Sequence, residues 1–482
     1  MKIQFNIHYI TQWGESLYLL LYNPEESTIK EPKSIVMQFN DKFEWTIEIT
    51  LDSNVSSVLY QYALLNSDKT FKREYGAIRK VEFDTTHENI KIQDYWRSSF
   101  GDSPFTSAAF TNCFFKRKEI TPVLNPEDAN LILRLNCPQL EPERHIAIIG
   151  NQKALGNWDE KGKVRLDETN FPIWSISFNA QQFTFPLEYK FLIVDTKTDK
   201  VLAWGGGPNR ILKSSSQKKL SVITEEHFLR TIPSWKGAGV AIPVFSLRSG
   251  EGFGVGEFND LKKMVDWAKK TGQRIIQTLP INDTILYHTN YDSYPYNAVS
   301  VHALHPIYLH LEGLGQLRNK KLKSYFETQK LALNSKTYCD YENVMRIKWE
   351  YFKAIFPQES PAVFASDDYK LFFEINKEWL VPYAAFSYLR DLNGTPEFGK
   401  WPEFNTYIKP DIEALSSPDT NHYQEIALFY YLQYHLHKQL VEAHDYAKAN
   451  GIAFKGDIPI GVSPRSVDAW MEPDLFNANG QA

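Results

Sequence analysis

Cysteine is scarce in this chain, and the few that occur exclude two kinds of covalent framework. Cys113, Cys137 and Cys339 are odd in number and widely spaced, and they form no CxxC pair with nearby histidines. This pattern is not typical of a disulfide scaffold or of a zinc site. We therefore interpret these residues as the reduced thiols of a cytoplasmic protein.

The chain also lacks an excess of basic residues, and it lacks long apolar runs. The chain has 53 Lys and Arg against 58 Asp and Glu, which gives a formal charge of −5. Nucleic acids and anionic membranes are bound through a basic surface, so we expect neither as a partner. No run approaches the ~20 apolar residues of a membrane span, and the N-terminal MKIQFNIHYITQW alternates like a strand rather than a signal peptide.

Aromatic residues, by contrast, are abundant. They make up 14% of the chain, with 12 Trp and 26 Tyr. Flat rings stack on nucleobases or on sugars, and without a basic surface sugars are the better match. The alternative is that the rings fill the cores of β-sandwiches.

Short alternating or apolar runs separated by turn residues predict β-structure in the first half of the chain. They occupy residues 1–120 and recur in residues 128–222. VLYQYALL matches LEYKFLIV, and REYGAIRK matches AWGGGPNR, which indicates an internal repeat. We predict two antiparallel, immunoglobulin-like β-sandwich modules, at 1–122 and 123–228.

Strands alternate with helices in the remaining residues, 229–482, which predicts a parallel sheet. The three expected strands are VAIPVFSL, RIIQTLPI and IAFKGDIPIGV, and the first helix is FNDLKKMVDWAKKTG. A long helical segment covers about 320–440. Three strands are fewer than a closed barrel needs, so we expect the N-terminal portion of a TIM-type (β/α)8 barrel that is incomplete by itself.

The second module carries a candidate sugar-binding site. Trp158 in LGNWDEKGKVRL and Trp204 in VLAWGGGPNR could present ring faces to adjacent glucose units, with Lys190 and Asn209 binding hydroxyls. The alternative is that both tryptophans are core residues. The GNW, EYKF and PNR segments resemble family 20 starch-binding modules, which implies that these four residues form the main glucan site. Gly205 stands where the family usually has Glu, which implies the loss of one polar contact.

The first module opens with TxxGExxY, which resembles the same family, but it has no GNW segment. Tyr75 takes the place of the second tryptophan, and Trp13 is the other exposed ring that we expect. A weak glucan site on Trp13 and Tyr75 and a purely structural module remain open alternatives.

Three blocks in the third region, 241–283, 292–309 and 454–476, resemble family 77 glycoside hydrolases, the 4-α-glucanotransferases or amylomaltases. Two preceding starch-binding modules point to the subtype that is similar to plant cytosolic disproportionating enzymes. The resemblance implies retaining transfer of α-1,4-glucosyl units from maltose or malto-oligosaccharides to starch or glycogen, without a cofactor or metal. The alternatives are a noncatalytic α-glucan-binding protein and an amylase-like hydrolase.

The same resemblance implies roles for five residues. Asp457 in GDIPIGV corresponds to a supporting active-site acid, and Tyr296 to an aromatic residue on the donor side. Ser293, Arg248 and Trp470 are further substrate-binding candidates, although each could serve loop packing instead. The R-x-D pattern of the family's nucleophile and its acid/base glutamate are absent, so we expect this chain to lack both catalytic carboxylates and to be inactive alone. Histidines 435, 437 and 444 do not have the spacing of a helical metal pair.

Overall fold

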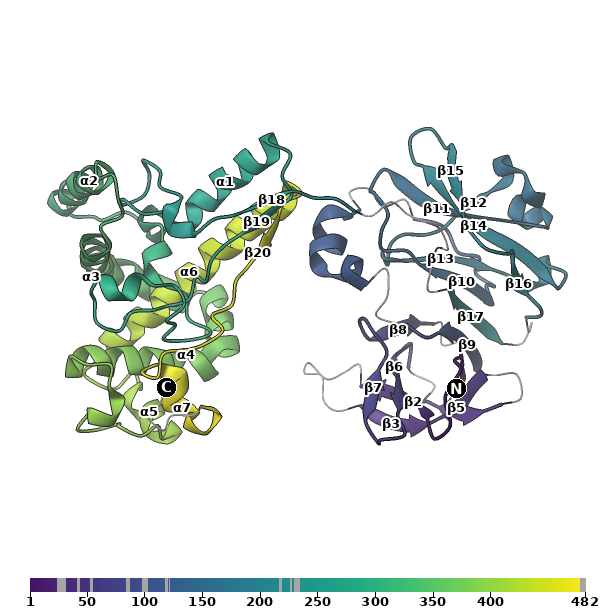
Figure 1. Cartoon of the computed structure of the whole chain (residues 1–482), viewed down its shortest axis with the longest axis horizontal. Helices are drawn as coiled ribbons and strands as arrows, with labels where there is room; N and C mark the ends of the chain where they lie inside the picture. Colours follow the sequence, from purple (N-terminus) through teal and green to yellow (C-terminus); the bar gives the residue numbers. More distant parts are fainter. Residues whose placement is uncertain are drawn as a thin grey trace. The chain divides into compact units, whose positions relative to one another are not determined.

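The structure is a computed structural model of the chain, with two compact units, Met1–Trp235 and Lys236–Ala482 (Figure 1). It describes residues 1–23, 32–40, 44–52, 55–83, 87–97, 103–117, 120, 122–215, 219–225, 228 and 235–476. The expected boundary at 228/229 adjoins residues 229–234, which lie outside the described residues. The expected division at residue 122 stays a prediction.

The first unit is built from short strands, as the alternating sequence predicts. Those of its N-terminal part are β1 (Lys2–His8), β2 (Ser16–Tyr22), β3 (Lys33–Val36), β4 (Gln38–Phe39), β5 (Glu44–Thr50), β6 (Ser57–Leu65), β7 (Phe71–Arg73), β8 (Arg79–Glu82) and β9 (Asn89–Tyr95). Those of its C-terminal part are β10 (Leu131–Asn136), β11 (Arg144–Gly150), β12 (Val164–Arg165), β13 (Ile173–Phe178), β14 (Leu187–Asp195), β15 (Val201–Trp204), β16 (Arg210–Leu212) and β17 (Leu220–Glu225).

One continuous sheet runs through both parts of this unit. Its strand order is β13-β10-β17-β9-β1-β5-β4, and β9 pairs with β17 in parallel, with Ile90 opposite Leu220 and Ile92 opposite Val222. Two separate sandwiches are therefore too simple a description, because the two parts share backbone hydrogen bonds across β9 and β17.

Two smaller sheets cover this shared sheet. β3-β2-β6-β7, with β8 beside β6, packs over a core that includes Phe5, Tyr62 and Val222. β12-β11-β14-β15, with β16 beside β14, packs over a core centred on Trp174 and Phe191. Because Val222 of β17 belongs to the first of these cores, the two cores cannot form fully independently.

The second unit has a parallel three-stranded sheet and a large helical region. The strands, in the order β18-β19-β20, are β18 (Gly239–Ala241), β19 (Ile275–Gln277) and β20 (Ala453–Lys455). The helices are α1 (Phe258–Lys270), α2 (Lys320–Asn334), α3 (Tyr341–Ala365), α4 (Asp367–Asn393), α5 (Lys409–Leu415), α6 (Tyr423–Ala449) and α7 (Val467–Met471). The three predicted parallel strands and the long helical segment are confirmed.

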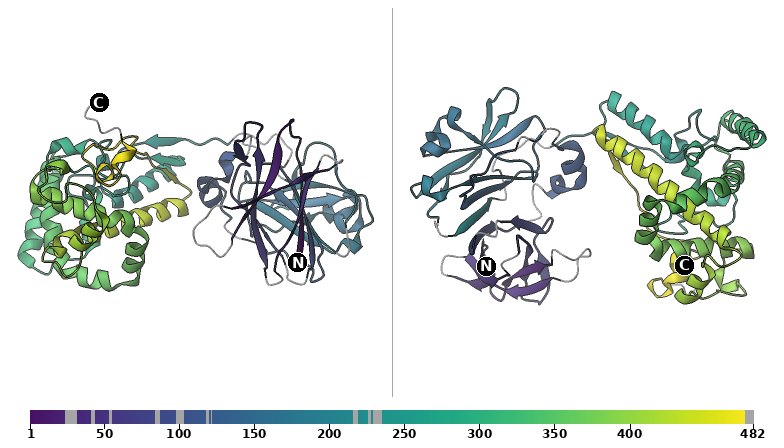
Figure 2. Two further views of the ribbon diagram at one scale, coloured as in Figure 1. Left: turned by 90° about the horizontal axis from the view of Figure 1, so that it is seen from below. Right: turned by 180° about the vertical axis from the view of Figure 1, so that it is seen from behind.

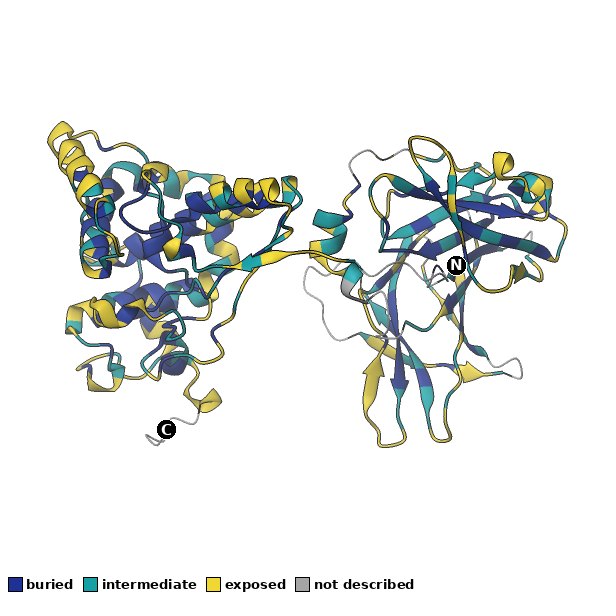
Figure 3. Cartoon of the chain, turned by 45° about the horizontal axis from the view of Figure 1, so that its top comes forward, coloured by how far each residue is buried: buried dark blue, intermediate teal, exposed yellow. Residues whose placement is uncertain are grey.

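Helix α6 is the centre of this unit. Every residue from 426 to 436 is buried, and α6 packs against α1, α3 and α4 (Figures 2 and 3). A helix that is apolar on all sides is stable only when other elements surround it. α1 and α6 also bury Val265, Ala447 and Ile276 together, which anchors the middle strand of the parallel sheet.

The predicted strand 452–462 is wrong beyond Lys455. The last ladder hydrogen bond runs from the Thr278 amide to the Lys455 carbonyl, 3.0 Å. The segment that follows β19, beside this one, then reaches Pro280, which has no N–H to donate. Asp457 consequently lies in the segment after β20 and not within a strand.

No helix in the described part of the chain is long and apolar enough to cross a membrane.

Candidate functional site

Trp158 and Trp204 come together on the outer face of the sheet that contains β11, β14 and β15. Their ring centroids are 6.4 Å apart and their planes differ by 28°. Trp204 ends β15, where it lies opposite Leu192, and Trp158 packs on the small cluster formed by Leu192 and its neighbours. Alternation along β14 places Leu192 and Val194 on this outer face, whereas Phe191 and Ile193 enter the core.

The loop that carries Trp158 has an unusual backbone. Asn157 and Trp158 have φ values of 49° and 64°, in the left-handed region. Gly156, at φ 77°, approaches Gly162 so closely that an added Cβ would lie 2.6 Å from the Gly162 carbonyl carbon. Non-glycine residues in this region cost about 1–3 kcal/mol each and persist where the surroundings hold them. The loop therefore stores strain to present the indole of Trp158.

A residue that the sequence analysis missed fixes the second ring. The Trp204 Nε1 donates to Glu160 Oε1 over 3.0 Å, and Glu160 follows Trp158 in the same loop. Trp204 remains 39% exposed, so it can still offer a ring face. The spacing of Glu160 from Trp158 was visible in the sequence, but its pairing across 44 residues was not.

Lys190 and Asn209, the other predicted members of this site, are also held in place. The Lys190 ammonium donates to the Gly207 carbonyl over 2.9 Å, leaving two of its three donors for other partners. The Asn209 amide donates to Glu188 Oε2 over 3.1 Å, and its carbonyl oxygen can still accept a hydrogen bond. The arrangement offers ring faces to the apolar side of a sugar and polar groups to its hydroxyls.

The candidate site of the N-terminal part is not assembled in the same way. Trp13 is fully exposed and Tyr75 is 44% exposed. Neither ring contacts another aromatic ring in the described part of the chain, in contrast to Trp158 and Trp204. A glucan site on Trp13 and Tyr75 stays a prediction.

In the second unit, Tyr296 and Asp457 meet although 161 positions separate them. The Tyr296 hydroxyl donates to Asp457 Oδ2 over 2.9 Å, and this hydrogen bond raises the pKa of Tyr296 above its usual value. Backbone pairing between the two segments explains the contact. Ala298 forms a parallel bridge with Val462, and the Ser463 amide donates to the Ala298 carbonyl over 2.9 Å.

Ser293 shortly precedes Tyr296 in the sequence and ends a short helical turn, Asn290–Ser293. Thr289 and the buried Asp292 cap this turn reciprocally, and Ser293 Oγ donates to the Asn290 carbonyl over 2.7 Å. Ser293 is exposed and stays a candidate.

Arg248 and Trp470 have structural contacts instead. Arg248 donates to the Lys336 carbonyl over 2.7 Å, which favours its alternative role in loop packing. Trp470 is only 2% exposed, and its Nε1 donates to the Phe404 carbonyl over 3.1 Å. Its ring lies against Phe386 and Trp401, which favours the alternative role in packing, and a contact of Trp470 with substrate stays a prediction.

Comparisons with known proteins match both units. Residues 242–482 match the family model described as 4-alpha-glucanotransferase, and residues 131–224 match the model described as starch binding domain. The 4-alpha-glucanotransferase DPE2 of Oryza sativa subsp. japonica is 34% identical over 499 residues, which cover 99% of this chain and 52% of the rice protein.

Other relatives match about half of the chain. The 4-alpha-glucanotransferase of Chlamydia caviae is 34% identical over 262 residues, covering 52% of this chain and 47% of that protein. The solved amylomaltase from Streptococcus agalactiae in complex with acarbose is 22% identical with a TM-score of 0.42, covering 50% and 47% of the two chains. The chain spans about half the length of the curated relatives it matches.

Proposed function

Since this chain belongs to the 4-alpha-glucanotransferase family, we propose that it serves the transfer of α-1,4-linked glucosyl units from maltose or malto-oligosaccharides to glucan acceptors such as starch and glycogen. The observation that carries the proposal is the hydrogen bond between Tyr296 and Asp457. It joins two of the three sequence blocks on which the family resemblance rests. A ring and a carboxylate side by side can bind a sugar through its apolar face and its hydroxyls together.

The reaction that we propose is a retaining double displacement. One carboxylate forms a glycosyl-enzyme bond, a carboxylic acid protonates the leaving oxygen, and a glucan hydroxyl then takes the place of water. In the described part of the chain, Asp457 contacts the Tyr296 hydroxyl and the Ile458 amide but no second carboxylate. We therefore give Asp457 a supporting role at the donor sugar, and we assign neither the nucleophile nor the proton donor to a residue of this chain.

We propose that β18, β19 and β20, with α1 and α6 against them, belong to a β/α-barrel of the TIM type. Three features support this: parallel pairing, helices between the strands, and a site just beyond the C-terminal end of β20. In such barrels the active face lies at the C-terminal ends of the strands. Asp457, two residues after β20, has that position.

We propose that Trp158, Trp204, Lys190 and Asn209 hold polymeric glucan near the transferase domain. The stacked ring pair and the match of residues 131–224 to a starch binding domain support this. Tethering raises the local concentration of acceptor chains, so a modest affinity suffices. Because its three cysteines are odd in number and widely spaced, we propose that the protein is cytoplasmic.

Incubation of the native protein with maltose and glycogen tests the transferase proposal. Free glucose and lengthened glycogen branches are the expected products, measured by a coupled glucose assay and by chain-length analysis after debranching. Glucose release without lengthening would favour a hydrolase, and glycogen binding without any turnover would favour a noncatalytic glucan-binding protein. Turnover by residues 1–482 alone would overturn our view that the reacting carboxylates are not among them.

A further inference from the structure

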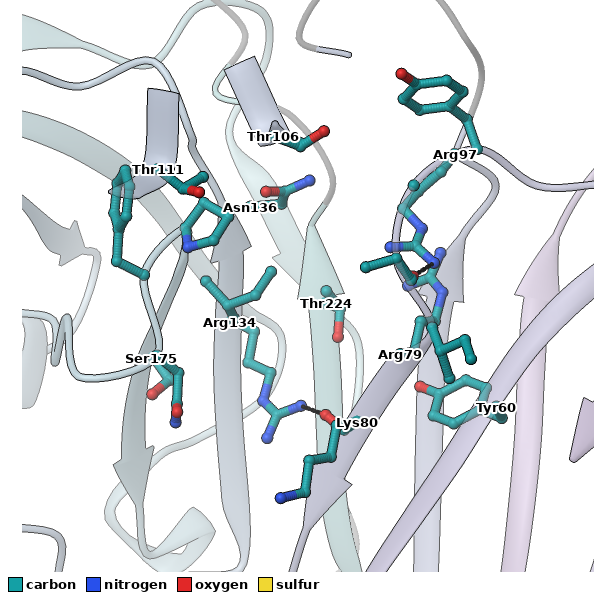
Figure 4. A pocket seen from close by; sticks show the side chains of 18 of the residues that line it. Tyr60, Arg79, Lys80, Arg97, Thr106, Thr111, Arg134, Asn136, Ser175 and Thr224 are labelled. Atoms are coloured by element: carbon teal, nitrogen blue, oxygen red, sulfur yellow. Dashed lines mark hydrogen bonds between the residues drawn. The ribbon is translucent and has the colours of Figure 1, made fainter. Parts of the chain in front are cut away.

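A cavity of about 390 Å³ lies within the first unit, at the junction of its N-terminal and C-terminal parts (Figure 4). One wall comes from β8 and the segment 75–78, and the other comes from β10, β13 and β17. The glucan platform, formed by Trp158, Lys190, Trp204 and Asn209, contributes no lining residue, and neither does the Tyr296–Asp457 pair. Tyr75, the candidate of the N-terminal part, does line it. We call it the junction cavity.

The shared sheet explains why the junction cavity is polar. On β10, Leu133 and Leu135 enter the core beneath the sheet, so alternation places Arg134 and Asn136 on the opposite face. On β17, Val222 packs in the N-terminal core, and Thr224, two residues further along the same face, reaches the cavity. The sheet face thus changes from apolar to polar where the covering strands end.

Charge on the opposite wall is nearly balanced. Arg79 pairs with the fully buried carboxylates of Glu74, at 2.8 Å, and Asp94, at 3.2 Å. Arg97 also pairs with Glu74, at 3.1 Å. Lys80 has its own partner, Glu82, at 2.6 Å.

Arg134 differs from these residues because it forms no ion pair in the described part of the chain. The carboxylates of Asp94 and Glu82 act on its charge only through longer-range electrostatics, and one of its terminal nitrogens donates to the Lys80 carbonyl over 3.3 Å. Its Nε is buried without a partner. Figure 4 shows the Arg134 side chain extending along the cavity wall toward Lys80. In the described part of the chain, the Arg134 guanidinium therefore lines the junction cavity without a direct ion pair.

The lining does not suit a neutral glucan chain. Phe171, the ring on the β13 side, is covered by the Arg117 guanidinium, whose central carbon lies 4.7 Å from the ring centroid. Among the described residues, Tyr75 has no ring beside it with which to form a platform. A guanidinium with free N–H groups is instead suited to the planar, forked arrangement of phosphate oxygens.

We propose that the junction cavity binds the phosphate ester of a sugar, with the phosphate on Arg134 and the sugar hydroxyls on Asn136 and Thr224. The cavity volume exceeds that of a phosphate ion, and both polar side chains are buried there, at 9% and 6% exposure. The ester could be a free hexose phosphate or a phosphorylated residue within a glucan. Both share the chemistry that the cavity recognises.

Isothermal titration of the 482-residue protein with glucose 6-phosphate, glucose and inorganic phosphate tests this proposal. We expect glucose 6-phosphate to bind at least about 10-fold more tightly than either fragment, because both halves of the ligand are then engaged. Arg134→Gln should weaken binding about 10-fold or more, and Arg144→Gln, at a partly exposed arginine of β11, should leave it unchanged.

Arg134 also donates to the Lys80 carbonyl and so links the two parts of the first unit. Because its replacement affects the fold as well as binding, a second variant is needed. Thr224→Val keeps the side-chain shape and removes only the hydroxyl, and it should weaken glucose 6-phosphate but not inorganic phosphate. Thermal unfolding checks that both variants remain folded. Equal binding of glucose and glucose 6-phosphate, or binding that neither variant changes, would overturn the proposal.

A phosphorylated malto-oligosaccharide distinguishes the two sources of ligand. If the phosphorylated malto-oligosaccharide binds more tightly than glucose 6-phosphate, and Arg134→Gln weakens that binding, the ligand is a phosphorylated glucan. Binding of the free hexose phosphate alone would identify the small metabolite. Trp158→Ala should not affect glucose 6-phosphate, so failure of the glucan platform and failure of the junction cavity are separable.

Discussion

The indole rings of Trp158 and Trp204 stack 6.4 Å apart although one residue lies in a loop and the other ends a strand 46 positions later. The strained backbone at Trp158 and the hydrogen bond from Trp204 to Glu160 fix the two rings relative to each other. A ring pair that is rigid before ligand binding loses little entropy when a sugar stacks on it. This is the physical basis of the first prediction.

Trp158→Ala or Trp204→Ala should weaken binding to soluble starch about 10-fold, measured by affinity electrophoresis. Trp267→Ala is the matched control, because Trp267 is an exposed tryptophan on α1 in the other unit. The double variant Trp13→Ala/Tyr75→Ala measures any contribution of the N-terminal part. Unchanged starch binding in both platform variants would remove the proposed site.

Tyr296→Phe should separate substrate binding from stability. The variant keeps the ring and loses only the hydroxyl that donates to Asp457. Because this contact is near solvent, we expect the unfolding midpoint to change little, while KM for maltose in the native protein rises several-fold. Tyr294→Phe, at the neighbouring exposed ring, is the control. An equal effect of the two variants would argue against a special role for the Tyr296–Asp457 pair.

Val222→Ala tests the shared sheet. Val222 lies on β17, in the C-terminal part of the first unit, but its side chain is fully buried in the N-terminal core with Tyr62. Truncation should cost roughly 2 kcal/mol of unfolding free energy and should lower the stability of the N-terminal part as well. Hydrogen exchange of β1 and β6 amides provides the measurement. Increased exchange confined to residues 123–228 would indicate two independent modules.

The second unit should lose stability in mild acid through His435. Burial lowers the pKa of His435 to about 4, below the usual value of 6.5. A base with a lowered folded-state pKa stabilises the fold above the unfolded-state pKa and loses that contribution as the pH falls from about 6.5 toward 4. The full contribution is on the order of 3 kcal/mol.

Urea unfolding at pH 7 and pH 5 measures this loss. His435→Phe removes the titrating group and a buried Nε2 without a partner, so its unfolding free energy should depend less on pH. His444→Phe is the control on the same helix, because His444 is exposed. Equal pH dependence of the wild type and His435→Phe would contradict the assignment.

Much of the fold could be predicted from local pattern. Alternating runs predicted most strands of the first unit, and apolar residues at helical spacing predicted α1 and α6. The local patterns of NIKIQDY in β9 and LSVITE in β17 did not indicate that these two strands pair in parallel. Their pairing depends on contacts between distant parts of the chain, which no local pattern contains.

The candidate sites were predictable by residue type but not by arrangement. Motif resemblance indicated Trp158, Trp204, Tyr296 and Asp457, but the bracing role of Glu160 follows from a contact over 44 residues. Trp470 shows why residue type alone is not enough. An aromatic residue in a functional motif can bind substrate or fill a core, and the 2% exposure of Trp470 favours the core.

The sequence by itself determined the family, the order of the glucan-binding and transferase regions, and the residue types of both sites, because motif chemistry and periodicity are local properties. Only the tertiary structure decided that the N-terminal and C-terminal parts of the first unit share one sheet, that Tyr296 reaches Asp457, and that Arg134 lines a cavity without an ion pair among the described residues. These features arise from backbone pairing and burial between distant segments, and such pairing is fixed by packing the whole chain.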